Sequence, residues 1–352
     1  MSVPLQLTLG SLLFVGMTLP VLASEGSDKG LTAVDGIKVG HHTFAERPTG
    51  CTVVLTESGA VAGVDVRGGA PGTRETDLLD PVNTVQEVHA VVLSGGSAFG
   101  LDAASGAVRW LEEKGIGYPV GPVKVPIVTG AILFDLFVGG KPEVRPGAGC
   151  GYKAAVAAST EAVAEGNVGA GAGATVGKLG GFGRAMKGGL GSASITLPDG
   201  LTVAALVAVN ALGDVIDPAT GAVIAGVRTA DGKGLADARE LVRSGALSRP
   251  QAGTNTTLGI VATNARLTQA EATKVARMAH DGFARAIDPA HTPADGDTVF
   301  ALATGTHDAP VNLLTVGALA AEVTAEAVVR AVRTATGIPG WPAAADLSPE
   351  TP

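Results

Sequence analysis

The chain has 352 residues, of which 46% are hydrophobic and only 3% aromatic, so Ala, Val, Leu and Ile must build the core of one large layered domain. The formal charge is −8 and no Lys/Arg cluster with interleaved aromatics occurs, which argues against a nucleic-acid partner. The 51 glycines follow no G-X-Y period and lie between β-branched runs, which excludes a collagen-like chain and indicates turns.

The first 23 residues resemble a secretory signal. Residues 5–22 are apolar, Val21 and Ala23 are small residues of the kind that a signal peptidase reads, and the next residues are polar. The leader has no Lys or Arg before its apolar stretch, so two interpretations stay open. We favour a cleaved signal that exports the protein to the periplasm or the medium; the alternative is an apolar arm or uncleaved anchor on a cytoplasmic protein. No later segment is typical of a membrane span, because charges and glycines interrupt each apolar stretch.

Short β-branched and apolar runs bounded by turn residues predict several strands in the first third of the chain. These runs are 37–41, 52–55, 61–66 and 90–93. A Ser-Gly-Gly-Ser turn at 94–97 leads into an expected helix over 103–114. A second helix is expected over 154–165, and a Gly/Ala tract follows at 169–177.

The pattern then returns to β-structure. Runs 192–197 and 202–210 flank the turn Pro198-Asp199-Gly200, which predicts a hairpin, and 216–228 is interpreted as a further ribbon. Residues 235–253 are polar and carry charges of both signs. This segment is the most linker-like part of the chain and a natural place for backbone cleavage.

The last part of the chain alternates strands with long helices. A β-branched strand is expected over 256–263, and Thr268 with Glu271 forms a capping box for a helix through Ala286. A further strand is expected over 298–304 and a long Ala/Val helix over 312–334. Strands and helices in separate blocks favour an α+β sandwich with helices layered on sheets.

The two cysteines, Cys51 and Cys150, exclude a zinc ribbon because no CxxC motif occurs. They could form one disulfide in an exported protein. We interpret them instead as two small buried thiols.

Several motifs for common chemistries are incomplete. The tract from Gly169 to Ala174 fits a loose GxGxxA pattern, but it does not lie between a clear strand and a helix. Leu179 follows Lys178 where a phosphate loop needs Ser or Thr. Ser97 lies in a turn after a strand, but Phe99 stands where a nucleophile elbow needs Gly.

The histidines show no metal-binding spacing, and we interpret them as surface or packing residues. Those considered are His41, His42, His89 and His291. No Ser-His-Asp triad, metal or cofactor is therefore expected.

A series of short motifs in a fixed order carries a more specific signal. They are Gly36–His41, Thr49–Val53, Arg67–Thr73, Leu93–Gly100, Gly169–Lys178, Met186–Gly191, Val207–Asn210, Asn255–Gly259, Val261–Asn264 and Asp295–Thr298. Through them the chain resembles the DmpA-type self-processing aminopeptidase family, whose relatives include β-peptidyl aminopeptidases and the nylon-oligomer hydrolase NylC. The resemblance implies a four-layer αββα sandwich like that of N-terminal-nucleophile hydrolases, of the DmpA/ornithine acetyltransferase type.

The same resemblance implies self-cleavage between Asn255 and Thr256. The catalytic domain would then consist of a larger fragment, 30–255, and a smaller fragment, 256–352. Thr256 Oγ1 would attack the preceding carbonyl, and the new α-amine, with a reference pKa of roughly 8, would become the base for its own hydroxyl. Thr254 and Thr257 compete for this role. We choose Thr256 because NylC-like sequences pair Asn with the first of two threonines.

Other family positions carry implied roles. Asn210 corresponds to an oxyanion donor, although it could be a plain strand-end Asn. Lys178 corresponds to a lysine beside the nucleophile, although it could be a solvated loop residue. Asp295 and Asp297 match the Asp-Gly-Asp of the NylC branch, where the carboxylates orient the nucleophile and the lysine, although a plain Asp-Gly turn would explain them.

Phe134 stands where some relatives have a pocket tyrosine, and Ser97 and Phe99 are further candidates for the substrate pocket. The function implied is an aminopeptidase acting on short peptides, assembled as a tetramer of processed heterodimers. Three alternatives remain. They are an endo-type hydrolase of nylon-like ω-amino-acid oligomers, an acyltransferase and a non-catalytic binding protein.

Overall fold

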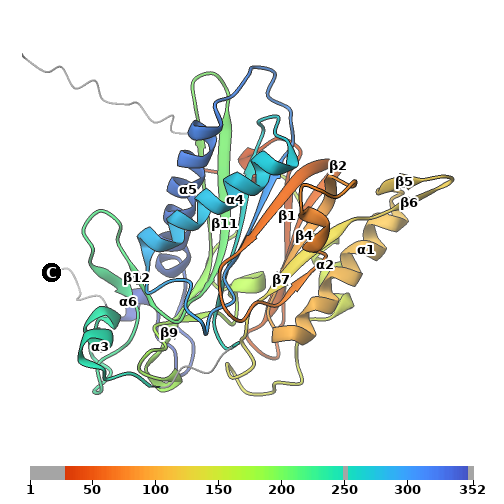
Figure 1. The fold of residues 1–352 in the computed structure, drawn as a ribbon. Helices are drawn as coiled ribbons and strands as arrows, with labels where there is room; N and C mark the ends of the chain where they lie inside the picture. The colour runs from red at the N-terminus through yellow and green to blue at the C-terminus, as the bar shows by residue number, and fades with distance from the viewer. Residues whose placement is uncertain (1–27, 249–252, 348–352) are drawn as a thin grey trace, which may run out of the picture.

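The computed structural model describes residues 28–248 and 253–347 (Figure 1). The predicted leader at 1–23 therefore lies outside the described residues. So does the part of the predicted linker at 249–252.

A nine-stranded sheet forms the centre of the fold, with strand order β10-β11-β14-β16-β2-β4-β7-β3 and β1 paired to β2. Its strands are β1 Lys38–Thr43, β2 Gly50–Val66, β3 Thr73–Arg74, β4 Glu87–Ser94, β7 Val128–Ile132, β10 Gly189–Thr196, β11 Thr202–Asn210, β14 Thr256–Thr263 and β16 Thr298–Ala303. Smaller sheets contain β5 Tyr118–Val120, β6 Val123–Val125, β8 Thr175–Val176, β9 Met186–Lys187, β12 Asp214–Ile216, β13 Val223–Ala225 and β15 Ile287–Asp288.

The long strand β2 joins two halves of this sheet. Its first part pairs with β1 and β4, and its last part pairs with β16. The pairing with β4 shifts register between Leu55 and Ala60. The sequence predicted two strands here, 52–55 and 61–66. They are one continuous strand, because β16 and β4 continue its hydrogen bonding on either side of the irregularity.

Three hydrophobic clusters define four layers. One lies between α4 (Gln269–Ala286) and α5 (Leu313–Arg333) and the β10-β11-β14-β16 half of the sheet. A second lies between the two halves, where β2, β4 and β7 face β11, β14 and β16. The third lies between β2 and β4 and the helices α1 (Ala103–Glu113) and α2 (Ala148–Val156). Figure 1 shows these helix pairs on opposite sides of the strands, which confirms the predicted αββα sandwich.

Most elements predicted by local signals are confirmed. The hairpin β10–β11, the strands β14 and β16 and the helix α5 lie within a few residues of the predicted bounds. The capping box of α4 is present, with both the Thr268 and Glu271 side chains bonded to the backbone of the other. The predicted ribbon over 216–228 is the pair β12–β13.

Two predictions of secondary structure are wrong, one for a helix and one for part of the linker. The helix expected over 154–165 is α2, which ends at Val156, because the chain turns away and Ser159 pairs with Val39 of β1. Part of the predicted linker, Ala238–Ser244, forms the helix α3, capped by the Asp237 side chain. The described part of the chain ends with the short helix α6 (Ala344–Leu347).

The interpretation of the cysteines as free thiols is also wrong. Cys51 at the start of β2 and Cys150 on α2 form a disulfide, with Cα atoms 6.2 Å apart. Both residues belong to the cluster between α2 and β2, which brings together positions separated by 99 residues.

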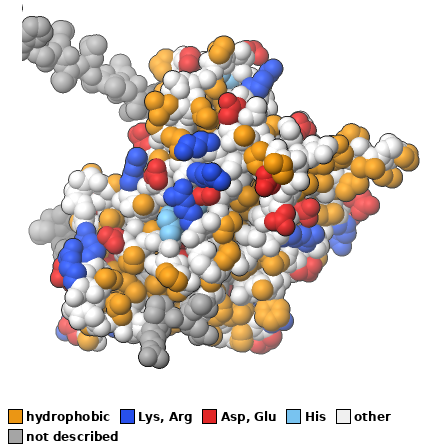
Figure 2. All heavy atoms as spheres, in the orientation of Figure 1, with side chains coloured by type: hydrophobic (Ala, Val, Ile, Leu, Met, Phe, Trp, Pro, Cys, Tyr) orange, Lys and Arg blue, Asp and Glu red, His pale blue; other side chains and the backbone are white. Residues whose placement is uncertain are grey.

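Figure 2 shows basic side chains beside acidic ones on the viewed face. Of the helices in the described ranges, none has the length and apolar character that crossing a bilayer requires.

Candidate active site

Thr256 is the first residue of β14 and lies at the centre of the main sheet. It is the register partner of Asn210, the last residue of the antiparallel neighbour β11. On the other side, β14 pairs in parallel with β16. Thr256 is 2% exposed and Asn210 is fully buried. Both side chains are thus held by the backbone pairing of central strands rather than by a surface loop.

The peptide bond before Thr256 is buried and held on two sides. The Thr256 hydroxyl donates to the carbonyl oxygen of Asn255. The same oxygen accepts a hydrogen bond of 3.0 Å from the Gly296 N–H, and Asn255 pairs with Asp295 in a parallel bridge. The nucleophile candidate therefore lies directly beside the carbonyl that the sequence predicts it to attack.

Lys178 follows the glycine tract and connects three segments of the site. Its Nζ donates to the Asn210 backbone carbonyl and to Asn210 Oδ1, both at 2.9 Å, and to the Thr254 carbonyl at 3.5 Å. Burial lowers the pKa of Lys178 to about 7, although the charges of Asp295 and Asp297 oppose this shift. Burial thus weakens the preference of this side chain for its charged form.

The amide of Asn210 has a fixed orientation. Its Oδ1 accepts hydrogen bonds from Lys178 and from the Thr175 N–H at 3.0 Å. Its Nδ2 therefore points the other way and donates to the Phe134 carbonyl at 3.1 Å. The tract before Lys178 and the loop after β7 thus converge on this one amide.

The two aspartates lie on the loop that enters β16. Asp297 Oδ1 accepts from the Thr257 N–H at 2.8 Å, and its Oδ2 accepts from the His291 N–H and lies 2.8 Å from His291 Nδ1. A side chain on Gly68 could not fit beside this loop, since a Cβ there would lie 2.4 Å from the Asp297 nitrogen.

Asp295 has a different set of contacts. It accepts hydrogen bonds from the Thr292 hydroxyl and from the Leu212 N–H at 3.2 Å. Burial, followed by the neighbouring charge of Asp297, raises the pKa of Asp295 to about 6. The site therefore contains a carboxyl group and an ammonium group whose pKa values burial shifts toward each other.

The sequence did not anticipate three residues that support this cluster. Thr175 orients Asn210, and His291, interpreted above as a surface or packing residue, bonds to Asp297. Lys187 is fully buried, and its Nζ donates to the carbonyls of Gly171, Ala174 and Gly188 at 2.8–3.0 Å. Thr175 lies in the motif Gly169–Lys178 and Lys187 in the motif Met186–Gly191. This position within the family motifs is the only feature of the sequence that could have indicated them.

The three residues predicted for the substrate pocket, Phe134, Ser97 and Phe99, differ in their contacts and exposure. The Phe134 carbonyl contacts Asn210, and its ring packs edge-on against Phe137 at a centroid distance of 4.7 Å. Phe99 lies on the short helix after β4, is 56% exposed and stacks on Arg145. Ser97 begins that helix, and its N–H bonds to the Leu133 carbonyl.

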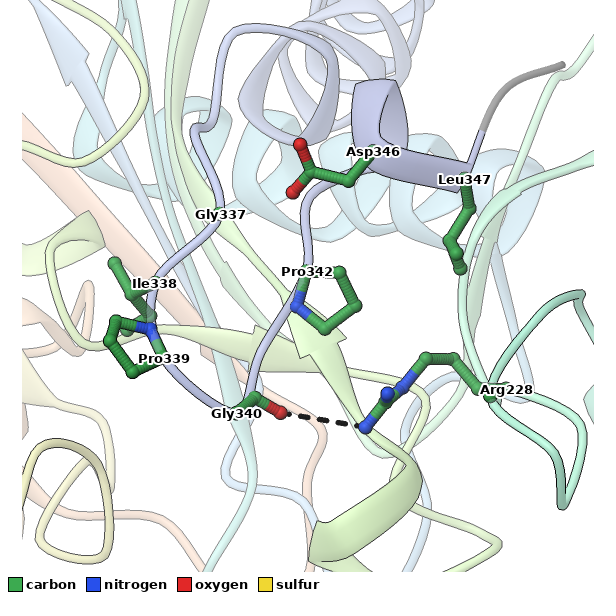
Figure 3. Close-up of a pocket in the computed structure, with 9 residues that line it drawn as sticks. Arg228, Gly337, Ile338, Pro339, Gly340, Pro342, Asp346 and Leu347 are labelled. Atoms are coloured by element: carbon green, nitrogen blue, oxygen red, sulfur yellow. Dashed lines mark hydrogen bonds between the residues drawn. The ribbon is translucent and has the colours of Figure 1, made fainter.

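A separate hollow of about 490 Å³ lies between the segments around Arg228 and Pro342 (Figure 3). Arg228 extends across it and donates to the Gly340 carbonyl at 3.4 Å. None of the residues assigned above to the Thr256 cluster lines this hollow. Within the described ranges, no group of three or more His, Cys, Asp or Glu residues is arranged to hold a metal ion.

The model of peptidase family S58 matches residues 29–344 of the chain. An uncharacterized aminopeptidase of Mycobacterium tuberculosis (strain ATCC 25618 / H37Rv) is 46% identical over 348 residues, which cover 91% of this chain and 98% of that protein. A 6-aminohexanoate-oligomer endohydrolase of Kocuria sp. (strain KY2) is 32% identical, covering 85% of this chain and 84% of the relative.

Solved structures share the fold. The L-aminopeptidase D-Ala-esterase/amidase of Ochrobactrum anthropi, described as a variant of the Ntn-hydrolase fold, superposes with a TM-score of 0.65 at 22% identity, over 89% of both chains. A β-aminopeptidase of Burkholderia sp. gives a TM-score of 0.61 at 23% identity, over 87% of both chains.

Proposed function

The chain belongs to peptidase family S58 and is a hydrolase of peptide or amide bonds, and we propose that Thr256 becomes its nucleophile after self-cleavage at Asn255–Thr256. The observation that carries the proposal is the contact between the Thr256 hydroxyl and the Asn255 carbonyl in the buried cluster. This contact places Oγ1 beside the carbonyl group whose carbon it must attack in an N→O acyl shift.

In turnover, the freed α-amine of Thr256 takes the proton from its own hydroxyl as that oxygen attacks a substrate carbonyl. A nearby Lys178 ammonium lowers the pKa of this amine and so favours its neutral, basic form. Asn210 donates to the developing oxyanion. Supporting these roles, Lys178 and Asn210 are hydrogen-bonded to each other, and Asn210 is paired with Thr256.

The two carboxylates hold backbone N–H groups at the start of β14 and just after β11. Asp297 holds the Thr257 N–H, the first peptide group after the nucleophile. Asp295 connects the entry of β16 to Leu212, just after β11. We propose that this arrangement keeps β14 in place once the chain is cut, so that the two fragments remain one domain.

We propose that the substrates are short peptides cleaved at their N-terminal residue. The Mycobacterium tuberculosis relative is named an aminopeptidase. It is 46% identical to this chain, and the match covers 98% of its length. A second candidate is endo-type cleavage of ω-amino-acid oligomers. It is supported by the Asp295-Gly296-Asp297 sequence and by 32% identity to a 6-aminohexanoate-oligomer endohydrolase.

Intact mass and N-terminal sequencing of the purified protein test the nucleophile. We expect a fragment of 97 residues beginning Thr256-Thr257-Leu258 that is absent in Thr256→Ala. An uncleaved chain that still hydrolyses peptides would refute the role of Thr256. An uncleaved, inactive chain would favour a binding protein.

A second assay separates the two substrate classes. The processed enzyme is given an alanyl anilide, its N-acetylated form and a linear 6-aminohexanoate trimer. An aminopeptidase specific for α-peptides hydrolyses only the first of these rapidly, because it requires a free amine on the carbon next to the scissile carbonyl, whereas the amine of 6-aminohexanoate lies at the far end of the residue. Faster hydrolysis of the trimer or of the acetylated form would favour the endo-type alternative.

A further inference from the structure

The parallel pairing of β14 with β16 extends to the residues that precede both strands, and so includes the peptide bond before Thr256. Regular parallel pairing begins at Leu258 and Thr298, and a separate parallel bridge joins Asn255 to Asp295. Within it, the Gly296 N–H donates to the Asn255 carbonyl oxygen at 3.0 Å. The Thr256 hydroxyl contacts this same oxygen. The scissile carbonyl thus has a fixed backbone donor.

The donor lies where negative charge would develop during cleavage. Attack on the Asn255 carbonyl turns its oxygen into an oxyanion, and effective donors lie about 2.7–3.1 Å from such an oxygen. Residue 296 must also leave room for the hydroxyl. A Cβ at this position would lie 2.6 Å from Thr256 Oγ1 and 2.7 Å from the Ala70 carbonyl oxygen. Glycine therefore allows the N–H and the hydroxyl to reach the carbonyl together.

Asn210 is engaged elsewhere in the uncleaved chain. Its Nδ2 donates to the Phe134 carbonyl at 3.1 Å, and its Oδ1 accepts from Lys178 and Thr175. Among the hydrogen bonds of the described residues, none joins the Asn210 amide to Asn255. The amide expected to serve turnover is therefore not the group that holds the scissile carbonyl.

We propose that the Gly296 backbone N–H is the oxyanion donor of self-cleavage, separate from the Asn210 amide that serves external substrates. The inference rests on the proposed self-cleavage at Thr256. In that step the bond between Thr256 Oγ1 and the Asn255 carbonyl carbon forms, and the bond from this carbon to the Thr256 nitrogen breaks. The nitrogen receives the proton that Oγ1 releases. Water then hydrolyses the ester, which gives the Asn255 carboxylic acid and restores the hydroxyl.

The direct test replaces Gly296 with glycolic acid during cell-free synthesis of the full chain. This change exchanges the N–H for an ester oxygen and adds no side chain. Glycolic acid at Gly183, a glycine with open space around it, is the matched control. The rate at which the fragment beginning at Thr256 appears is measured by mass spectrometry. We expect a loss of about 10²–10³-fold at position 296, the usual effect of removing one oxyanion donor.

Melting curves of both ester-containing chains, made in the Thr256→Ala background, check that the fold is retained. If the unsubstituted chain is not cut, the proposed function fails. If it is cut and the folded Gly296 ester is cut at the same rate, the Gly296 inference fails.

The variant Asn210→Ala provides a second experiment. We expect its hydrolysis of peptides to fall by a much larger factor than its rate of self-cleavage, because the Asn210 amide donates to the Phe134 carbonyl and not to the Asn255 carbonyl. Parallel loss of cutting in this variant would overturn the separation of the two donors.

Discussion

His291 Nδ1 lies 2.8 Å from Oδ2 of Asp297, and the other oxygen of this carboxylate accepts the Thr257 N–H at the same distance. The His291 ring thus fixes the rotation of a carboxylate that holds the peptide group next to the proposed nucleophile, Thr256. The backbone N–H of His291 donates to the same Oδ2 at 3.0 Å, in a residue with φ of 55°. The positive φ directs both donors of one residue toward one carboxylate oxygen.

We expect His291→Gly to lower kcat by about tenfold or more, since a hydrogen bond to a charged group contributes about 1.5–3 kcal/mol. His291→Asn should retain most of the activity. Asn also tolerates a positive φ, and its Nδ2 occupies nearly the position of the lost Nδ1. Steady-state kinetics of the processed variants test this comparison. Equal activity of the Gly and Asn variants would show that the imidazole contact does not matter.

Gly296→Ala should slow self-cleavage strongly. The added Cβ would lie 2.6 Å from Thr256 Oγ1, so the hydroxyl or the loop must move. A displacement of about 1 Å at a reacting group costs about 10²-fold in rate. Gly183→Ala is the control, because nothing lies within 4 Å of its added Cβ. Time courses of fragment formation measure the effect, and matching rates in the two variants would contradict this account.

Local signals explain which parts of the fold could be predicted. The capping box at Thr268 and Glu271 and the β-branched run of β14 depend on neighbouring residues, and both are present. Contacts between distant residues explain the errors. The expected helix over 154–165 ends early because Ser159 pairs with Val39, and Cys51 meets Cys150 through packing of β2 on α2. Nothing in the spacing of these residues indicates either contact.

The candidate site also consists of residues that are distant in the sequence, so its prediction depended on the family resemblance. The five proposed catalytic residues come from the glycine tract, the end of β11, the start of β14 and the loop before β16, which only the sheet brings together. The contact of His291 with Asp297 spans six residues, but it requires a turn that composition does not indicate. Support from Lys187 also depends on tertiary folding, because its three acceptors are backbone carbonyls.

The disulfide should stabilise the described fold. Disulfides commonly contribute about 2–4 kcal/mol, and the long loop between Cys51 and Cys150 favours a large effect. We expect the double variant Cys51→Ala/Cys150→Ala to unfold at lower urea concentration in the uncleaved Thr256→Ala background. Reductant should shift the parent protein toward the double variant and leave the variant unchanged. Two titratable thiols in the native, unreduced protein would contradict the pairing.

Lys187 makes the stability depend on pH in a defined direction. Burial lowers its pKa from 10.5 to about 7, although Asp135 opposes the shift. Below pH 7 the group is protonated whether the chain is folded or unfolded. Between pH 7 and 10.5 the unfolded chain binds a proton that the folded chain lacks. Unfolding therefore takes up a proton, and the free energy of unfolding rises with pH across this window.

Lys178 has the same direction of shift, so both lysines contribute to this rise. In the Thr256→Ala background, we expect Lys187→Met to reduce the slope by up to about 1.4 kcal/mol per pH unit, the value for one proton. At neutral pH the variant should also be less stable, since three buried carbonyls lose their donor. Urea unfolding at several pH values between 7 and 10 measures both effects. An unchanged slope in Lys187→Met, with a reduced slope in Lys178→Met, would mean that Lys187 keeps its proton across the window and that its three carbonyl contacts hold the ammonium form.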